Sequence, residues 1–296
     1  MPTPEAGDGQ LRVKVAAAAL NPFDSSVAKG FLKDHMPHHF PLVPCSDIAG
    51  RIDEVGGGVG QWKVGDEVFG LLGTMAIGEG ALAEFAIATA GTIARRPPSM
   101  DVQFAAALPL AGVSAQMCVD PMDLTAGKTV VILGAAGGIG GFAVQLAKLT
   151  GAHVIAVTRS VNSDYVRHLG ADEVIDYSTE DVVATVRRSQ PKGIAGIVHT
   201  SGDADAVAAL SALVNEGGYV TSMRGAAKVE DLAKRNLTGI NIRTMTTTAA
   251  LEKLAALVES GMLKRPEIKT FKLEDSNQAF DDIGTGHVRG KLVVTL

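Results

Sequence analysis

The chain has 296 residues, a formal net charge of −5, 46% hydrophobic residues and 20% charged residues. This is an ordinary soluble composition, and the length suits two domains or one large domain. The acidic balance and the lack of lysine and arginine clusters argue against nucleic acid or an anionic membrane as partners. No apolar run approaches a membrane span, and the N-terminus has no signal-peptide pattern. We therefore expect a cytoplasmic protein, which the widely separated Cys45 and Cys118 also suit.

The N-terminal part of the chain is predicted to form short strands separated by turns. Residues 10–16 alternate apolar and polar side chains, which is typical of a half-buried strand. A polar break is expected at 21–26 and an irregular loop at 35–44. The histidines of that loop have no cysteine or carboxylate at a ligand spacing, so no metal site is predicted. Further short strands are predicted at Asp47–Val55, Glu67–Leu72 and Ala83–Ala88, and together they indicate a small barrel.

The segment Thr129–Ser160 has the pattern of a βαβ unit. Thr129–Leu133 is an apolar run with β-branched residues that indicates a buried parallel strand, and His153–Thr158 is a second strand. Between them, apolar residues recur at helical spacing from Ile139. A strand, a glycine-rich turn, a helix and a strand within about thirty residues predict a dinucleotide-binding unit.

The glycine-rich turn is the predicted cofactor cradle. On the G-x-G-x-x-G pattern, Ala135 stands at the first position, followed by Gly137 and Gly140. A turn without β-carbons lets the main chain approach a pyrophosphate, and the following helix aims free N–H groups at it. The predicted cofactor-binding residues here are Gly134, Ala135, Ala136, Gly137, Gly138, Ile139 and Gly140.

The end of the second strand favours NADPH over NADH. An NAD site usually has an acidic residue there to hold the ribose 2′-hydroxyl, whereas this chain has Thr158, Arg159 and Ser160. Arg159 can pair with a 2′-phosphate, and a charge-assisted bond of this kind is worth roughly 1.5–3 kcal/mol. NADPH is therefore expected to bind more tightly than NADH, by a factor of about ten or more.

After Ser160 the alternation of helices and strands continues to Met245. Counted from Thr129, it gives six strands with helical crossovers, as a doubly wound dinucleotide sheet requires. The last segment leaves this rhythm, and we expect it to return to the first domain, with the cofactor crevice between the two. The predicted fold is α/β, with a β-rich catalytic domain at 1–100 and 249–296 and a Rossmann doubly wound six-stranded parallel sheet at 101–248.

Motifs that span nearly the whole chain follow one another at Leu20–Asp24, Pro41–Gly50, Trp62–Gly70, Ala107–Ala115, Gly134–Gly140, Leu169–Asp172 and Gly290–Val293. In this order they resemble the zinc-free medium-chain dehydrogenases/reductases of the quinone-oxidoreductase (zeta-crystallin-like) group. The resemblance implies a GroES-like β-barrel domain beside the Rossmann domain. It also implies NADPH-dependent reduction of a quinone, an enone or an enal, and a homodimer.

The zinc-dependent branch of that superfamily is excluded at its ligand positions. Asn21 stands where its first catalytic cysteine would stand, Ser46 stands at its histidine position, and the four-cysteine structural lobe is missing. Without a zinc ion to polarise an oxygen, alcohol dehydrogenation is disfavoured. Conjugate reduction needs a hydride and hydrogen-bond donors that hold the enolate until it is protonated.

The resemblance also assigns site residues. It places Asn21, Ser46 and Asp47 at the nicotinamide end of the cleft, and Ser26 where several quinone reductases have a possible proton-donating tyrosine. Asn21, Ser26 and Asp47 are the candidate catalytic residues. Serine is a poor acid, so the alternatives are protonation by solvent or a different chemistry. Further candidate cofactor-binding residues are Ser46, Ser114, Thr158, Arg159, Ser160, Tyr177, Ser201, Gly202 and Met223.

Several alternatives accompany this interpretation. Members of this family have an additional N-terminal hairpin. Three explanations for this chain are open: its barrel lacks a strand pair, the start of the sequence is trimmed, or a partner covers the exposed edge of the barrel. A short-chain dehydrogenase is excluded because no tyrosine has a lysine four residues after it. Two other functions stay open. One is an NADPH-binding sensor or structural protein without turnover, and the other is a dedicated biosynthetic enoyl reductase.

Overall fold

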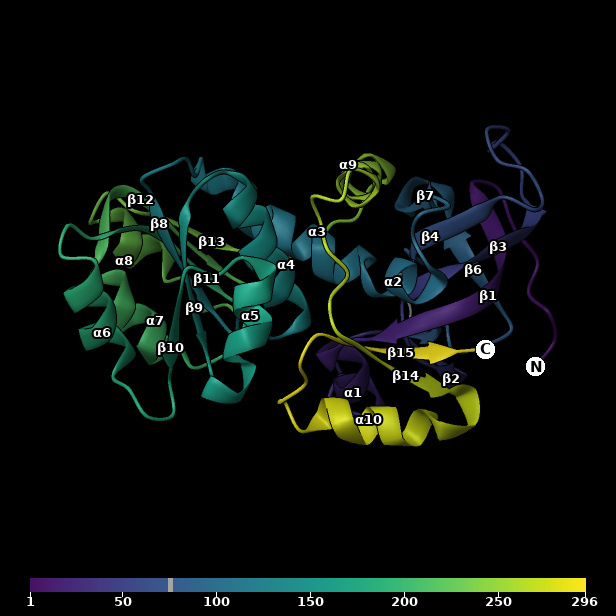
Figure 1. Cartoon of the computed structure of the whole chain (residues 1–296). Helices are drawn as coiled ribbons and strands as arrows, with labels where there is room; N and C mark the ends of the chain where they lie inside the picture. The colour runs from purple at the N-terminus through teal and green to yellow at the C-terminus, as the bar shows by residue number, and fades with distance from the viewer. Residues whose placement is uncertain (74–76) are drawn as a thin grey trace. The chain divides into compact units, whose positions relative to one another are not determined.

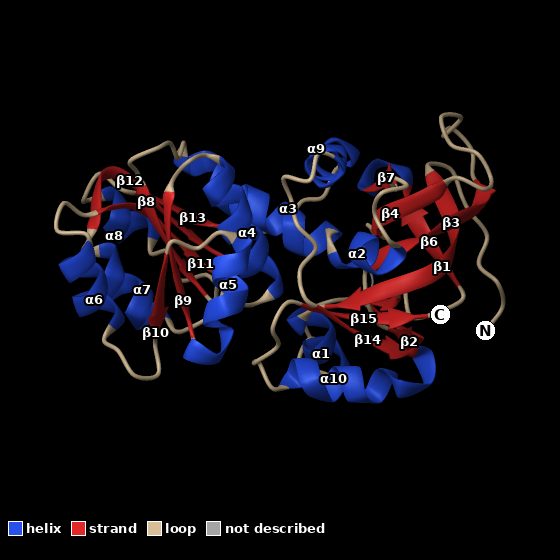
Figure 2. Cartoon of the chain, viewed as in Figure 1, coloured by secondary structure: helices blue, strands red, loops and turns tan. Residues whose placement is uncertain are grey.

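The computed structural model describes residues 1–73 and 77–296. These residues divide into two units. Unit 1 consists of Met1–Val113 and Thr246–Leu296, and unit 2 consists of Ser114–Met245. Strands dominate unit 1, whereas strands and helices alternate in unit 2 (Figures 1 and 2). Among the described residues, no helix combines the length and apolar character that crossing a bilayer requires.

Unit 2 is built on a sheet of six parallel strands in the order β10-β9-β8-β11-β12-β13. The strands are β8 (Thr129–Leu133), β9 (His153–Thr158), β10 (Glu173–Asp176), β11 (Ile194–His199), β12 (Val214–Ser222) and β13 (Thr238–Asn241). Numbered along the chain, their spatial order is 3-2-1-4-5-6, the order of dinucleotide-binding sheets. The predicted six-stranded Rossmann sheet is confirmed.

Helices cover both faces of this sheet. They are α4 (Gly138–Leu149), α5 (Ser163–Leu169), α6 (Val182–Ser189), α7 (Ala204–Ser211) and α8 (Val229–Ala233). Figure 1 shows α4 and α5 on one face and α6, α7 and α8 on the other. All five residues of β8 are therefore buried, as its uniformly apolar sequence predicts for a strand covered on both faces.

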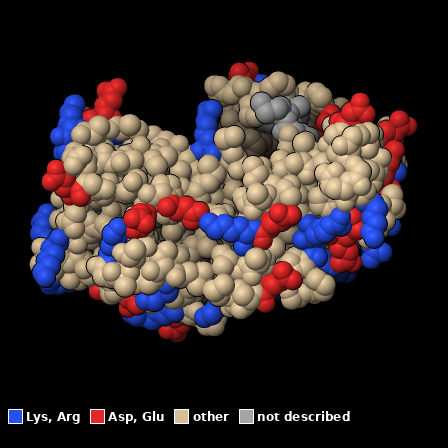
Figure 3. Space-filling view, turned by 90° about the horizontal axis from the view of Figure 1, so that it is seen from above, with Lys and Arg blue, Asp and Glu red and all other residues tan. Residues whose placement is uncertain are grey.

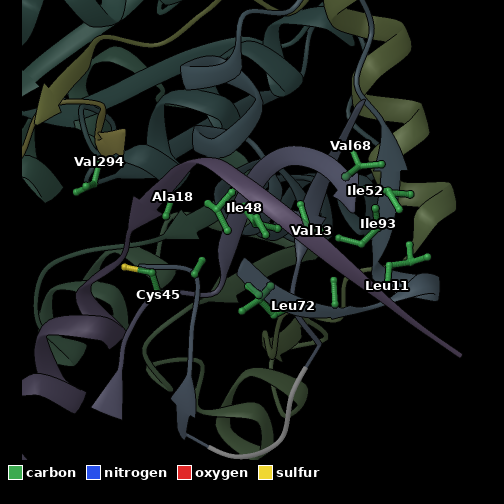
Figure 4. Packing of buried hydrophobic residues seen from close by; sticks show 14 of the residues in the cluster. Leu11, Val13, Ala18, Cys45, Ile48, Ile52, Val68, Leu72, Ile93 and Val294 are labelled. Atoms are coloured by element: carbon green, nitrogen blue, oxygen red, sulfur yellow. The ribbon is translucent and has the colours of Figure 1, made fainter. Parts of the chain in front are cut away.

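The described residues of unit 1 form a seven-stranded sheet. Its strands run in the order β14-β15-β1-β3-β4-β7, and β6 also pairs with β1. The strands are β1 (Gln10–Leu20), β3 (Asp47–Val55), β4 (Glu67–Leu71), β6 (Phe85–Thr89), β7 (Ile93–Arg95), β14 (Ile268–Lys272) and β15 (Lys291–Thr295). Alternate side chains of β1 enter the apolar core, where Leu11 and Val13 lie near Ile48 and Ile52 of β3 (Figure 4).

The remaining elements complete the described chain. The small sheet pairs β2 (His38–Val43) with β5 (Ile77–Glu79). The other helices are α1 (Pro22–Ala28), α2 (Val102–Ala107), α3 (Pro109–Val119), α9 (Thr248–Glu259) and α10 (Ser276–Gly284). Short 3₁₀ turns are η1 (Ala90–Thr92), η2 (Asp120–Met122), η3 (Ser160–Asn162) and η4 (Leu273–Asp275). Charges of both signs are interspersed on the face shown in Figure 3.

Two local predictions were wrong. The polar break expected at 21–26 is instead part of helix α1. This helix begins at Pro22, and the Asp24 side chain caps it by accepting the N–H of Asn21 at 2.7 Å. The expected irregular loop at 35–44 contains β2, whose partner β5 lies more than thirty residues further along the chain. A strand stabilised by such a distant partner leaves little signal in its own sequence.

Candidate functional site

The turn after β8 approaches its neighbours so closely that side chains are excluded. A β-carbon at Gly140 would lie 2.1 Å from the carbonyl oxygen of Gly134. At Gly134, where φ is +79°, a β-carbon would lie 2.6 Å from the hydroxyl oxygen of Thr200. Glycine is therefore required at both positions. Ala135 and Ala136, between these glycines, are buried.

Helix α4 begins with unused main-chain donors. Its N-cap is Gly137, and no side chain of the described residues caps the helix. Gly137, Gly138 and Ile139 are partly exposed. The first N–H groups of a helix have no partner within it, and together with the helix dipole they bind anions. The glycine turn and this helix start thus form an anion-binding cradle of the kind that holds a dinucleotide pyrophosphate.

The sheet register brings the predicted cofactor residues to one edge. Leu133 at the end of β8 pairs with Val157 of β9 and with His199 of β11. Thr158 of β9 pairs with Asp176 of β10. The carboxyl ends of parallel strands share one edge, so the segments that follow these strands lie next to the glycine turn.

Arg159 and Ser160 follow β9 at this edge. Among the described residues, the half-buried Arg159 guanidinium has no hydrogen bond or ion pair. Thr158, buried before it, has its hydroxyl oxygen 3.1 Å from Asn162 Nδ2. The exposed Ser160 gives its main-chain N–H to Asp176 at 2.7 Å, and its hydroxyl also interacts with this carboxylate.

The carboxylate of Asp176 is fully occupied within the protein. It accepts the hydroxyl and the N–H of Ser178 at 2.6 and 2.9 Å and the N–H of Ser160. The Ser178 bonds, with those of Ser160, hold the pKa of the Asp176 carboxyl well below its usual range. Tyr177 follows it and is half exposed. Asp176 thus fixes the turn from which Tyr177 projects.

The turn after β11 is held by His199. Its Nδ1 lies 2.9 Å from the Ser222 hydroxyl and its Nε2 lies 3.4 Å from the Gly202 carbonyl oxygen. Ser201 and Gly202 are exposed, and Met223 donates its N–H to the carbonyl of His199 at 2.9 Å. The side chain and the main chain of His199 therefore connect the segments after β11 and β12 that contain these predicted cofactor residues. The sequence analysis did not identify this role, although a histidine ending an apolar strand is a signal for it.

Ser114 lies elsewhere in unit 2. It belongs to α3, is fully buried, and shares a hydrogen bond of 2.6 Å with the hydroxyl of Thr244. Its predicted contact with the cofactor stays a prediction.

A second polar cluster lies in unit 1 and contains two of the predicted catalytic residues. Asn21 Nδ2 donates to Asp47 Oδ2 at 2.7 Å, and Asp47 Oδ1 accepts the N–H of Leu110 at 2.8 Å. The ammonium of Lys291 completes the cluster by donating to Asn21 Oδ1 at 2.7 Å. The side chains of Asn21, Asp47 and Lys291 are buried. Lys291 was missed because its role depends on partners far away in the sequence.

The same cluster extends through Asp24 to Cys45. Asp24 accepts the N–H groups of Asn21 and Cys45 at 2.7 and 3.1 Å. Burial raises the pKa of Asp24 to about 6, and burial also raises the pKa of the Cys45 thiol, so this cysteine is protonated and unreactive.

The remaining predicted residues of unit 1 lie outside this network. Ser26 in α1 donates its hydroxyl to the Pro22 carbonyl at 3.1 Å. Ser46 is half-buried, and its carbonyl accepts the N–H of Leu72 at 3.0 Å. Within the described ranges, no group of three or more His, Cys, Asp and Glu side chains could hold a metal ion.

Comparison with known proteins gives matches to both parts of the chain. The model of the alcohol dehydrogenase GroES-like domain matches residues 7–98, and the model named zinc-binding dehydrogenase matches residues 169–294. A chloroplast envelope quinone oxidoreductase homolog from Arabidopsis thaliana is 33% identical over 307 residues, which cover 99% of this chain and 92% of that protein. An NADPH-dependent alkenal/one oxidoreductase from the same plant is 32% identical, with 98% and 73% covered.

Solved structures give the same result. The quinone oxidoreductase from Coxiella burnetii has a TM-score of 0.88 to this chain at 29% identity, and the match covers 100% of this chain and 93% of that one.

Proposed function

We propose that this chain, which belongs to the zinc-free quinone-oxidoreductase group of the medium-chain dehydrogenases/reductases, uses NADPH as its reductant. As an NAD(P)H oxidoreductase of that family, it would reduce a quinone or the C=C bond of an enone or enal. The names of the two Arabidopsis relatives, a quinone oxidoreductase homolog and an alkenal/one oxidoreductase, support these two substrate classes. The cytoplasmic location and the homodimer stay predictions.

The residues of unit 2 fit a dinucleotide. Gly134 and Gly140 leave no room for side chains, and the uncapped start of α4 offers main-chain N–H groups to a pyrophosphate. Residues after β11 and β12, held by His199, would contact the cofactor beside this turn.

The Arg159 guanidinium, which has no hydrogen bond or ion pair within residues 1–73 and 77–296, is the observation that favours NADPH. Such a half-buried cation, at the strand end that would approach the adenosine ribose, is suited to a 2′-phosphate. The neighbouring Asp176 carboxylate is occupied by Ser160 and Ser178, and is therefore not available to hold a 2′-hydroxyl as the acid of an NAD site does.

The chemistry divides between cofactor and protein. When bound, the nicotinamide would supply a hydride to the acceptor carbon. The protein must then stabilise negative charge on the substrate oxygen, and fixed N–H donors achieve this at little reorganisation cost. Asn21, a buried amide held by Asp47 and Lys291, is the candidate donor in unit 1.

The test combines binding with turnover. We expect calorimetry on the whole chain to show NADPH binding more tightly than NADH, and NADPH absorbance to fall when a panel of quinones, enones and enals is added. Binding without turnover anywhere on the panel would instead support a sensor. Binding of neither coenzyme would contradict the proposal.

A further inference from the structure

Lys291 places a charged amine inside unit 1. Its side chain is 4% exposed, and that of Asp47 is 0% exposed. A buried charge is tolerated only where it is paired and hydrogen-bonded. The Lys291 ammonium meets both conditions, because it donates to the Leu20 carbonyl at 3.1 Å, to Asn21 Oδ1 at 2.7 Å and to Asp47 Oδ2 at 3.3 Å.

The sheet register brings these side chains together. β15 runs antiparallel to β1 with Leu292 opposite Leu20, so Lys291 comes opposite Asn21, the residue after β1. On the other side of β1, Ala19 pairs with Asp47 of β3. Three neighbouring strands thus place an ammonium, an amide and a carboxylate at one end of the sheet.

The two charges allow one orientation of the Asn21 amide. Its Oδ1 faces the Lys291 ammonium, and its Nδ2 donates to the Asp47 carboxylate. The opposite orientation would aim an NH₂ group at the ammonium and an oxygen at the carboxylate, which are both repulsive. The oxygen of Asn21 is therefore already used, and one of its two Nδ2 hydrogens is bonded to Asp47. The amide can offer a ligand only the second hydrogen.

We propose that Lys291 is a positioning residue that holds the Asn21 amide as a hydrogen-bond donor to the oxygen on which negative charge develops in the substrate. This proposal rests on the proposed function. Removal of one donor to such an oxygen typically lowers kcat by about 100- to 1000-fold. Without Lys291 only the Nδ2 bond to Asp47 still orients the amide, so the amide stays in the donor state part of the time, and we expect a loss of about 10- to 100-fold.

The kinetic test uses the whole chain with Lys291→Met, which removes the ammonium, and Asn21→Asp, which keeps an oxygen for Lys291 but has no N–H. We expect both to lower kcat while the dissociation constant for NADPH stays unchanged. Lys291→Arg should retain most of kcat because it keeps the charge. Lys269→Met is the matched control, since Lys269 pairs with Asp282 at the surface.

Lys291→Met leaves Asp47 without its cation and can fail to fold. Lys291→Gln is then the second variant, since its uncharged amide pairs with either orientation of Asn21 and should also lower kcat. Wild-type kcat in a folded Met or Gln variant would overturn the proposal.

A spectroscopic test does not depend on turnover. The side-chain NH₂ signals of Asn21, assigned by their loss in Asn21→Asp, should shift in the Met or Gln variant and stay in place in Lys269→Met. Unchanged signals would overturn the proposal. A wild-type protein that reduces no compound on the panel would overturn the proposed function, and the NMR comparison then decides whether Lys291 orients Asn21.

Discussion

The imidazole Nδ1 of His199 lies 2.9 Å from the hydroxyl oxygen of Ser222, and both side chains are buried at the ends of adjacent strands. This hydroxyl oxygen also accepts the N–H groups of Arg224 and Ala226 at 3.1 and 3.0 Å. Its own hydrogen therefore points to His199, and Nδ1 is the acceptor. Nε2 then has the proton and faces the Gly202 carbonyl. The imidazole is neutral, in agreement with its pKa, which burial above all lowers.

The neutral His199 predicts a loss of stability in mild acid. Because its pKa is lowered in the folded state, the unfolded chain binds more protons once the pH falls below the ordinary histidine pKa of about 6.5. The contribution of His199 to the free energy of unfolding is thus complete above about pH 6.5 and declines below it. We expect His199→Asn to flatten this dependence in urea unfolding at a series of pH values. The exposed His287→Asn is the control, and equal slopes in the two variants would contradict the assignment.

Arg159→Glu is expected to abolish the preference for NADPH. The substitution removes the guanidinium, which has no partner among the described residues, and places a negative charge where we expect the 2′-phosphate. NADPH should bind at least about tenfold more weakly, with little change for NADH, which lacks this phosphate. Calorimetric titration of both coenzymes measures the difference. Arg187→Glu, in the last turn of α6, is a control for a general charge effect, and an unchanged preference in Arg159→Glu would refute the assignment.

Local patterns were sufficient to predict the Rossmann unit. β8 and β9 have the predicted bounds, Thr129–Leu133 and His153–Thr158, because strands buried on both faces are apolar throughout. The glycine turn was also predictable, since Gly140 is constrained by the carbonyl oxygen of Gly134, only a few residues away. Both signals lie within one βαβ unit.

The partners of the buried charges could not be predicted in the same way. Lys291 and Asn21 are 270 positions apart, and only the pairing of β15 with β1 brings them together. A lysine at the start of a C-terminal strand usually points into solvent. The role of His199 was likewise not predicted, because its partner Ser222 lies on the next strand. Sequence patterns predict elements better than they predict which polar side chains meet.

Two glycines of the same turn should respond differently to alanine. At Gly140 a β-carbon would collide with the main chain of Gly134, so Gly140→Ala should destabilise unit 2 itself. At Gly137, whose φ is −77°, the nearest atom would lie at an ordinary 3.5 Å. Gly137→Ala should therefore fold normally but bind NADPH more weakly, because its methyl group occupies the approach to the pyrophosphate.

Thermal unfolding and NADPH titration separate these effects. Gly91→Ala, where a β-carbon would meet no atom of the described residues within 4 Å, is the control for both measurements. Undiminished NADPH binding by Gly137→Ala would show that the pyrophosphate does not lie against this turn.

Asp24 should make the protein less stable as the pH rises, which is the opposite of the usual behaviour of a carboxylate. Burial raises its pKa from 3.8 to about 6, and the Asp47 charge adds to this, whereas Lys291 and the N–H groups of Asn21 and Cys45 lower it. The folded state therefore binds a proton more readily than the unfolded chain between about pH 4 and 6. Across this window the ionisation of Asp24 should lower the free energy of unfolding by up to about 3 kcal/mol.

Asp24→Asn tests this dependence. The variant loses an acceptor at every pH, because one amide oxygen replaces the two oxygens that accept the N–H groups of Asn21 and Cys45. It should therefore be less stable than the wild type near pH 4, and the difference should narrow or reverse by about pH 7, since the variant has no carboxyl group to ionise. Urea unfolding of both proteins at several pH values measures this, with the exposed Asp205→Asn as control. Parallel curves for Asp24→Asn and the wild type would mean that Asp24 titrates alike in the folded and unfolded chains.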